Sequence, residues 1–586
     1  MAARADAIIT AALRPELFTD RGLVSISRTV LVAVLSLLVL VGFGLRVSNL
    51  SAEGLSEDEL NKLQAVADYR ANGLTAANGE HPFLMKALQT STLFLADKWN
   101  ASSLGSTRPI SPETALRLPG AIFGALTVIL LYLLAAELFG AEVGLIAAAL
   151  WAFDPTAIGL NRIAKEDTFL LFFFLLANVF WLRGQRVAES GSGERPEKYY
   201  WLTAASFGAM LASKYLPQAL TISLAYYWLF QRIPETRWRL GKKRMLIFFA
   251  VMGIAFLVLN PTILLPATWR QMGLFAGQKL IGHDGYEFMG QLFSHRMTDW
   301  LKGIPWYFYH LAVAVKLPVL TVIGFAAGVP LLFRRKLGDG RYFVGLWLIL
   351  WMMTFSFTGG KFLRYFTLVV PAVLITSALG VQFISCWIAR LVSRLLSTQS
   401  PQVYLRAVVA LLVVAGAFAA SMEAAPHFRM YTNKFGGGMK NAGYYFPHDE
   451  FYDASMREIM SEIAKRARPG AKVASETPSV ASHYAQRAHR PDLVCVMVSN
   501  PGELKQLNEG DFVIDARGRR YFSNEMVMQT LRQTSAPAFQ VSLAGGYSAS
   551  AYQLDQKSRD AIINAANQLP RLTTMVRPPV NPAAAP

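Results

Sequence analysis

Three acidic residues in a row follow the first long apolar segment of the chain: Glu57, Asp58 and Glu59. The same stretch ends in GEHPFLMK, which carries His81 and Lys86. An acidic cluster where a membrane span meets water is unusual, because ionisable groups at membrane depth are costly and usually functional. A carboxylate there could act as a general base toward a hydroxyl group. These residues are therefore the first candidates for a reactive site.

Further charged residues recur at the ends of later apolar segments. On the topology set out below they share one membrane face with Asp58, and they are Arg162, Lys165, Glu166, Asp167, Lys214, His283, Asp284, His295, Lys361 and Arg364. One carboxylate beside several cations would suit the transfer of a sugar from a lipid-linked phosphate to a hydroxyl group. Phosphate is already a weak base, so no general acid is needed. Cations would stabilise the charge that builds on it as the bond to the sugar breaks.

Each of these residues also has a structural explanation. Carboxylates after a span can form the solvated end of a loop, and a lysine near a span can extend its ammonium group to the interface. The specific alternatives are a loop end for Glu57, a turn at His81-Pro82, an ion pair between Arg162 and Asp167, interfacial extension of Lys214, and anchoring of a span by Lys361 and Arg364. No metal site is predicted, because the spacing of His283, Asp284 and His295 matches no metal-site pattern.

The composition indicates a membrane protein that crosses the bilayer many times. Hydrophobic residues make up 53% of the 586 residues and charged residues only 16%, whereas soluble proteins usually have about 25% charged residues. Apolar runs of about 20 residues recur along the chain. We predict a polytopic α-helical fold with about eleven transmembrane helices, near residues 29–47, 114–138, 143–160, 166–182, 199–213, 215–231, 244–264, 308–333, 342–357, 365–386 and 405–422.

The orientation follows from the short loops on the side of the N-terminus, which are basic. Two of them, 232–244 and 334–341, together carry Arg232, Arg237, Arg239, Lys242, Lys243, Arg244, Arg334, Arg335, Lys336 and Arg341. Basic loops stay in the cytoplasm, so we expect a cytoplasmic N-terminus and an outward-facing site. The same loops account for much of the formal charge of +18, so no nucleic-acid partner is predicted.

The expected domain organisation has four parts. Residues 1–28 form a cytoplasmic N-terminal segment, and 29–422 a transmembrane catalytic domain with outer loops at 48–113 and 265–307. Within the first loop, amphipathic helices are expected around residues 60–69 and 83–99. Residues 423–575 form a small α/β domain outside the membrane, with strands at 472–475, 493–498, 512–514 and 539–543. The Pro/Ala-rich end, 576–586, is expected to be disordered. No cleaved signal peptide and no disulfide framework are predicted.

Several short motifs between residues 30 and 450 resemble the bacterial form of the dolichyl-phosphate-mannose–protein mannosyltransferase family, within the GT-C class of membrane glycosyltransferases. Aminoarabinose transferases that act on lipid A are close relatives of that family. The matching pieces are Asp58-Glu59, GEHPFLMK with His81 and Lys86, Arg162-Ile-Ala-Lys-Glu-Asp167, Ser213-Lys214-Tyr215, GGKFLRYFTLVVPAV and YTNKFGGGMKNAGYYFPHDEFYD. Glu80 and Phe83 depart from the family pattern.

The resemblance implies an inverting transferase that moves a sugar, mannose in this family, from a polyprenyl-phosphate carrier to Ser/Thr hydroxyls of exported proteins. It would act at the outer face of the cell inner (plasma) membrane, among membrane lipids, without a required cofactor. By the same resemblance Asp58 would be the catalytic base, Glu59 would shape its surroundings and Asp167 would be the second acidic residue. Candidates for the donor phosphate are Arg162, Lys86, Lys214, Arg364, His81 and Lys361.

Three alternatives remain open. The acceptor could be lipid A or another glycan or lipid, since all of these present a hydroxyl group. The protein could be a transporter or flippase of lipid-linked sugars, although transporters usually place charges near the bilayer midplane and often contain inverted repeats. It could also be a non-catalytic assembly protein that binds partners through its outer domain.

Overall fold

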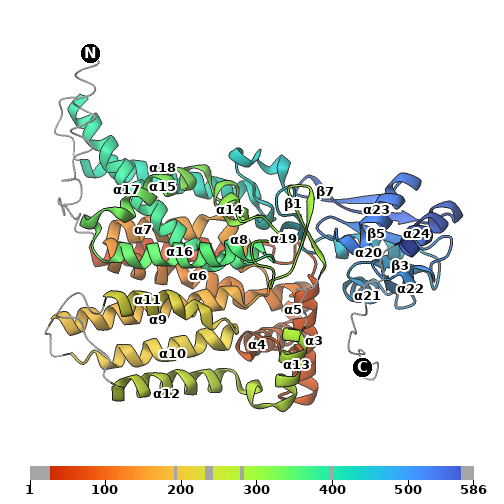
Figure 1. Ribbon diagram of the computed structural model, residues 1–586, viewed down its shortest axis with the longest axis horizontal. Coiled ribbons are helices and arrows are strands. Elements are labelled where there is room, and N and C mark those ends of the chain that lie inside the picture. The colour runs from red at the N-terminus through yellow and green to blue at the C-terminus, as the bar shows by residue number, and fades with distance from the viewer. Residues whose placement is uncertain (1–26, 191–193, 231–241, 278–282, 396–401, 569–586) are drawn as a thin grey trace.

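The computed structural model describes residues 27–190, 194–230, 242–277, 283–395 and 402–568. Apolar helices lie side by side in a bundle, and a small sheet domain sits at one end of it (Figure 1). The predicted Pro/Ala-rich tail, almost all of the N-terminal segment 1–28 and most of the basic loop 232–244 lie outside the described residues. The chain is a multi-pass membrane protein of mainly helical fold.

Six described helices are long and apolar enough to cross a membrane by themselves: α2 (Arg28–Val47), α6 (Pro112–Phe139), α9 (Asp167–Ser190), α16 (Gly340–Phe357), α17 (Val370–Leu395) and α18 (Gln402–Ala424). A helix needs about 20 residues to span the hydrocarbon core. Two consecutive helices, α7 (Ala141–Phe153) and α8 (Pro155–Asn161), are long and apolar enough only when taken together, and they are bent by 61°. All of them coincide with predicted spans.

The remaining predicted spans contain helices that are short, interrupted or, in α12, as long as α16 but basic at the start. They are α10 (Glu197–Ser213), α11 (Leu220–Phe230), α12 (Lys242–Leu259), α14 (Phe308–Lys316) and α15 (Val319–Gly328). The prediction of single helices over 143–160 and 308–333 is wrong, because Pro155 and Pro318 divide them. Proline lacks the amide hydrogen that a helix needs and pushes the preceding residue out of the helical region. The number of helices that cross the membrane stays a prediction.

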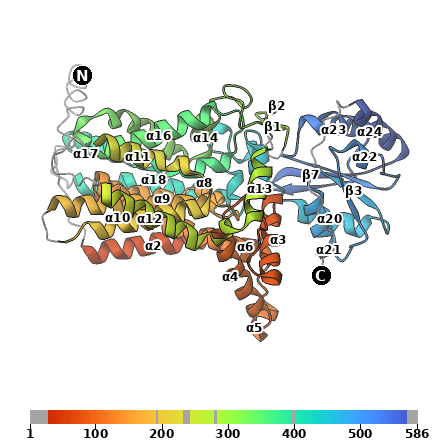
Figure 2. The same ribbon diagram turned by 60° about the horizontal axis from the view of Figure 1, so that its bottom comes forward.

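The first outer loop forms a group of helices across one end of the bundle, where it faces the sheet domain (Figures 1 and 2). Its helices are α3 (Glu57–Asn72), α4 (Phe83–Asn100) and α5 (Ser103–Thr107). α3 begins with a capping box, in which Ser56 and Glu59 satisfy each other's backbone amides. The second outer loop contains α13 (Pro266–Gly277) and an antiparallel hairpin of β1 (Gly285–Phe288) and β2 (Gln291–Ser294).

The C-terminal sheet has five strands in the order β4-β3-β5-β7-β6. These are β3 (Lys472–Ser475), β4 (Val494–Met497), β5 (Phe512–Ala516), β6 (Phe539–Leu543) and β7 (Gly546–Gln553), and β7 runs antiparallel to both of its neighbours. α20 (Met456–Arg466) precedes the sheet, α21 (Pro478–Arg487), α22 (Pro501–Leu504) and α23 (Phe522–Thr534) lie between its strands in the chain, and α24 (Gln556–Gln568) follows it. The sequence analysis missed β7, because GYSASAYQ carries small and polar residues instead of an apolar run.

One hydrophobic core is shared between the C-terminal domain and the first outer loop. Leu55 and Leu60 at the start of that loop belong to the same buried cluster as Ile459 and Ile463 of α20. A separate cluster, which includes Val513 and Val527, fills the other face of the sheet. Burying apolar area between the two parts holds them together, so the domain is packed directly against the end of the bundle that carries Asp58.

Candidate functional site

Asp58 lies in the first turn of α3, where side chains from three distant parts of the chain converge on it. Its Oδ2 is 2.5 Å from the Nζ of Lys165, between α8 and α9, and 3.8 Å from an Nη1 of Arg364. Arg364 comes from a short 3-10 helix, Leu363–Leu368. The hydroxyl of Tyr452, which follows α19 (Pro447–Phe451), donates a hydrogen bond to the same oxygen. Lys165, Arg364 and Tyr452 all lie closer to Oδ2 than to Oδ1, so Oδ1 is the oxygen of Asp58 with fewer close polar contacts.

The surroundings keep Asp58 ionised at neutral pH. Burial raises the pKa of this carboxyl, but the charges of Lys165, Arg364 and Lys62 outweigh burial and hold it well below its usual range. Burial lowers the pKa of Lys165 to about 8, although Asp58 opposes this shift. The Asp58 side chain is still 31% exposed. A solvent-accessible carboxylate that is charged at pH 7 can accept a proton from an incoming group.

A second charged layer lies beside this carboxylate. Glu166 Oε1 is 2.9 Å from Lys62 Nζ and 3.4 Å from His81 Nδ1. Burial lowers the pKa of His81 to about 3, so its imidazole is neutral. Asp167 Oδ1, at the start of α9, is 2.5 Å from the Nζ of Lys214, which also lies 4.7 Å from the ring centre of Tyr365. The structure thus brings four predicted residues, His81, Asp167, Lys214 and Arg364, to the neighbourhood of Asp58.

Two predicted residues have their polar groups engaged in holding the first loop. Glu59 is buried, pairs with the guanidinium of Arg117 at 2.7 and 2.8 Å, and accepts the backbone N–H of Ala164 at 3.0 Å. Lys86 donates from its ammonium to the carbonyls of Ala77, Asn78 and His81 at 2.7–3.1 Å. Glu59 therefore positions α3 without facing the cavity, and the geometry gives no support for a contact between Lys86 and a phosphate.

Two further predicted cations are likewise directed at the backbone. Arg162 donates to the carbonyls that end α2, at Leu45, Arg46, Ser48 and Asn49, over distances of 2.7–3.1 Å. Lys361 donates to the carbonyls of Ile304, at 2.7 Å, and Thr358. These bonds satisfy carbonyls at chain turns and at a helix end. Both residues thus have structural roles, but not the expected ones. Asp167 pairs with Lys214 instead of Arg162, and Lys361 is buried instead of anchoring a span at the interface. A phosphate role for either lacks geometric support.

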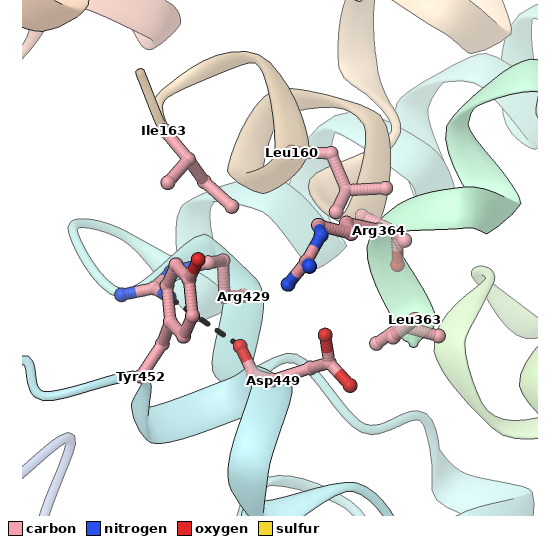
Figure 3. A pocket seen from close by; sticks show the side chains of 8 residues that line it. Leu160, Ile163, Leu363, Arg364, Arg429, Asp449 and Tyr452 are labelled. Carbon is pink, nitrogen blue, oxygen red and sulfur yellow. Dashed lines mark hydrogen bonds between the residues drawn. The ribbon is translucent and has the colours of Figure 1, made fainter. Parts of the chain in front are cut away.

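Further side chains surround the residues predicted for the site. Figure 3 shows Arg364, Arg429, Asp449 and Tyr452 around a small cavity that is lined mainly by apolar side chains elsewhere, with Arg429 donating to the backbone carbonyl of Asp449 at 3.4 Å. Tyr452 and Asp449 fall within the motif that ends in FPHDEFYD. Lys165 and Glu166 fall within the motif before Asp167. The motifs therefore pointed to the right segments, but only the folded arrangement shows which side chains meet.

The arrangement combines a proton acceptor with cations that can hold an anion. Asp58 supplies the acceptor, and Lys165 and Arg364 supply positive charge within 4 Å of it. Cations that face developing negative charge stabilise a transition state. Among the described residues no group of three or more His, Cys, Asp or Glu side chains is placed to hold a metal ion.

Comparison with known proteins gives one family match and several fold matches. Residues 110–266 match the family model for dolichyl-phosphate-mannose-protein mannosyltransferase. Comparison with curated proteins found no match. The structure of ArnT from Cupriavidus metallidurans bound to undecaprenyl phosphate is similar over 90% of this chain and 98% of that chain, with 14% identity and a TM-score of 0.50.

The oligosaccharyltransferase of Archaeoglobus fulgidus in its apo form is similar over 90% of this chain and 75% of that chain, with 13% identity and a TM-score of 0.51. The oligosaccharyltransferase AglB from Archaeoglobus fulgidus, in complex with an inhibitory peptide and a dolichol-phosphate, is similar over 90% of this chain and 74% of that chain, with 11% identity and a TM-score of 0.50. These likenesses extend over the helical bundle and the C-terminal domain together. The chain therefore shares the fold of these membrane transferases, and residues 110–266 are similar to the protein mannosyltransferase family.

Proposed function

We propose that this protein transfers a sugar from a polyprenyl-phosphate carrier to a hydroxyl acceptor, with inversion, at the outer face of the cell inner membrane. The observation that carries the proposal is the contact of Asp58 with both Lys165 and Arg364. ArnT in one matching structure is bound to undecaprenyl phosphate, and AglB in another to a dolichol-phosphate. These ligands support the same class of donor here. The protein mannosyltransferase family match supports mannose as the sugar and Ser/Thr of exported proteins as the acceptor.

The reaction needs one proton acceptor and one stabilised leaving group. The acceptor hydroxyl attacks the anomeric carbon from the side opposite the phosphate, so a new C–O bond forms as the C–O bond to the phosphate breaks. The bonding electron pair leaves with the phosphate, and the hydroxyl proton passes to Asp58. Oδ1 is the oxygen suited to receive it, since Lys165, Arg364 and Tyr452 all lie closest to Oδ2. The reaction requires no redox cofactor.

Donor binding would also raise the basicity of Asp58. Lys165 and Arg364 hold the pKa of this carboxyl low while they face it. A phosphate group carries negative charge and attracts the same two cations. When it binds, part of their charge is directed to the phosphate, so Asp58 becomes a better base. The base is then activated only when a donor is present.

The test uses the purified protein with labelled polyprenyl-phosphate mannose and, in separate reactions, a Ser/Thr peptide, a lipid and a glycan acceptor. We expect transfer to the peptide. We expect Asp58→Asn to reduce the rate by roughly 10²- to 10⁴-fold, the usual contribution of a general base, with donor binding retained. Asp97→Asn is the matched control, because the Asp97 side chain is 53% exposed on α4 and pairs with Arg70 at the surface.

The outcomes separate the candidate functions. Transfer to the lipid or glycan alone would support the lipid A or glycan alternative. Movement of the labelled donor across a vesicle bilayer without transfer would support a flippase. Turnover that survives in Asp58→Asn would reject this residue as the base.

A further inference from the structure

A turn of the C-terminal domain docks on the start of the first outer loop through three consecutive residues. The hydroxyl of Tyr452 donates to Asp58 Oδ2. The carboxylate of Asp453 accepts the backbone N–H of Glu57 at 3.1 Å. The carbonyl of Ala454 accepts the backbone N–H of Gly54 at 2.8 Å. The turn Tyr452–Ala454 therefore binds the segment Gly54–Asp58 at three points, and one of them is the carboxylate of Asp58.

The turn is itself held rigidly. Asp453 is buried and pairs with the guanidinium of Arg519, whose Nε lies 2.7 Å from Oδ1. Arg519 also lies 3.8 Å from Glu57 Oε2, so it links the domain to the loop a second time. Tyr452 and Asp453 both adopt left-handed backbone conformations, with φ of 44° and 61°. Non-glycine residues seldom adopt that region and persist there where their surroundings fix them, often at functional sites.

We propose that Tyr452 is a positioning residue of the transferase, whose hydroxyl anchors Oδ2 of Asp58 so that Oδ1 faces the acceptor hydroxyl. The proposal rests on the proposed function. The terminal torsion of an aspartate is broad and roughly two-fold, so its two oxygens exchange places easily unless one is held. Lys165 and Arg364 hold Oδ2 in the free protein, but a donor phosphate competes for both. The neutral hydroxyl of Tyr452 has no charge for the phosphate to attract and stays on the carboxylate.

The geometry around Tyr452 agrees with this role. Its ring lines the small cavity with Arg364, Arg429 and Asp449, and Arg429 lies 5.6 Å from the ring centre (Figure 3). The C-terminal domain thus contributes a side chain to the site as well as packing against it. In the reaction the proton of the acceptor hydroxyl moves to Oδ1, while the hydroxyl of Tyr452 keeps its own proton and only donates.

The test is Tyr452→Phe, which removes one oxygen and keeps the ring. We expect kcat to fall roughly 10- to 100-fold, in line with loss of a hydrogen bond to a charged group, with the donor KM unchanged. A hydrogen bond to the ionised carboxylate favours ionisation, so its loss raises the pKa of Asp58. The acidic limb of the kcat profile should therefore move to higher pH. Tyr444→Phe is the control, because Tyr444 is 45% exposed.

A double-mutant cycle completes the test. If Tyr452 acts through Asp58, adding Tyr452→Phe to Asp58→Asn should lower the residual rate no further. Wild-type kcat and an unmoved acidic limb in Tyr452→Phe would overturn the proposal. A fall in unfolding temperature together with a raised donor KM, and additive loss in the double mutant, would also overturn it by showing a structural role. Absence of transfer by the wild-type protein would instead overturn the proposed function.

Discussion

At the scale of single residues, the direction of a side chain decides its role more than its type does. Arg162 and Arg364 are both arginines at the ends of predicted spans, and the family resemblance makes both of them candidates for binding the donor phosphate. Arg364 points at Asp58, with its guanidinium carbon 3.9 Å from the ring centre of Phe362. Arg162 instead donates to the carbonyls that end α2 and lies over Phe428 at 5.0 Å. Only the first is free to turn toward a bound anion.

A matched pair of variants tests this difference. We expect Arg364→Met to raise the donor KM roughly 10- to 100-fold, because a hydrogen bond to a charged group contributes about 1.5–3 kcal/mol. Arg162→Met should leave the donor KM unchanged and lower stability by about 1–3 kcal/mol, since the carbonyls at the end of α2 lose their charged donor. Initial rates over a range of donor concentrations and thermal unfolding in detergent measure the two effects. Equal changes of KM in both variants would contradict the assignment.

At the scale of elements, the start of α3 is fixed before any substrate binds. Ser56 and Glu59 form its capping box, and Glu59 pairs with Arg117 of α6. Arg117 also donates to the carbonyls of Leu50, Glu53 and Gly54 at 2.7–2.8 Å. One buried guanidinium therefore ties the turn before α3 and its first turn to a membrane-spanning helix. This arrangement places Asp58 within the site, and it gives Glu59 a supporting role one step removed from the reaction.

Removing that guanidinium should loosen the element. Breaking a buried ion pair from one side leaves an unpaired charge and costs about 3–5 kcal/mol. We expect Arg117→Met to lower the unfolding temperature of the purified protein clearly and to reduce transfer with it. Arg108→Met is the control and should change neither, because Arg108 is exposed near the end of the first outer loop. An unfolding temperature equal to that of the wild type would show that the pair contributes little.

The elements themselves could largely be predicted from the sequence, but their meeting points could not. Apolar runs predicted the helices, and Ser56 with Glu59 is a recognisable helix start. Pro155 and Pro318 are signals for a helix break, but the length of the apolar runs around them favours one unbroken span at each place. The contact of Tyr452 with Asp58 joins positions 394 residues apart. Local patterns carry no information about such a contact, because it depends on how the whole bundle and the sheet domain pack.

At the scale of the whole molecule, the site lies at the end of the bundle that faces the C-terminal domain (Figures 1 and 2). The domain reaches this end through Tyr452 and through Arg429, which pairs with Glu53 of the first loop. Tyr484 and Arg487 of α21 bind Glu113 at the start of α6. Bundle, loop and domain therefore form one unit around Asp58. A fixed end of this kind suits a reaction in which donor lipid and acceptor approach from different phases.

The orientation of this unit in the membrane gives the last prediction. α16 ends at Phe357, shortly before Arg364, which contacts Asp58, so the exposed basic turn before α16 lies at the opposite end of the bundle. Basic turns of this kind stay in the cytoplasm.

A labelling experiment tests this orientation. Cys386 and Cys495 are replaced with serine, and a single cysteine is introduced as Arg335→Cys in that turn or as Glu509→Cys in the C-terminal domain. Both positions are exposed. A membrane-impermeant maleimide added to spheroplasts should label the cysteine at position 509 at once and the cysteine at position 335 only after permeabilisation. The reverse pattern would put Asp58 in the cytosol and would contradict transfer at the outer face.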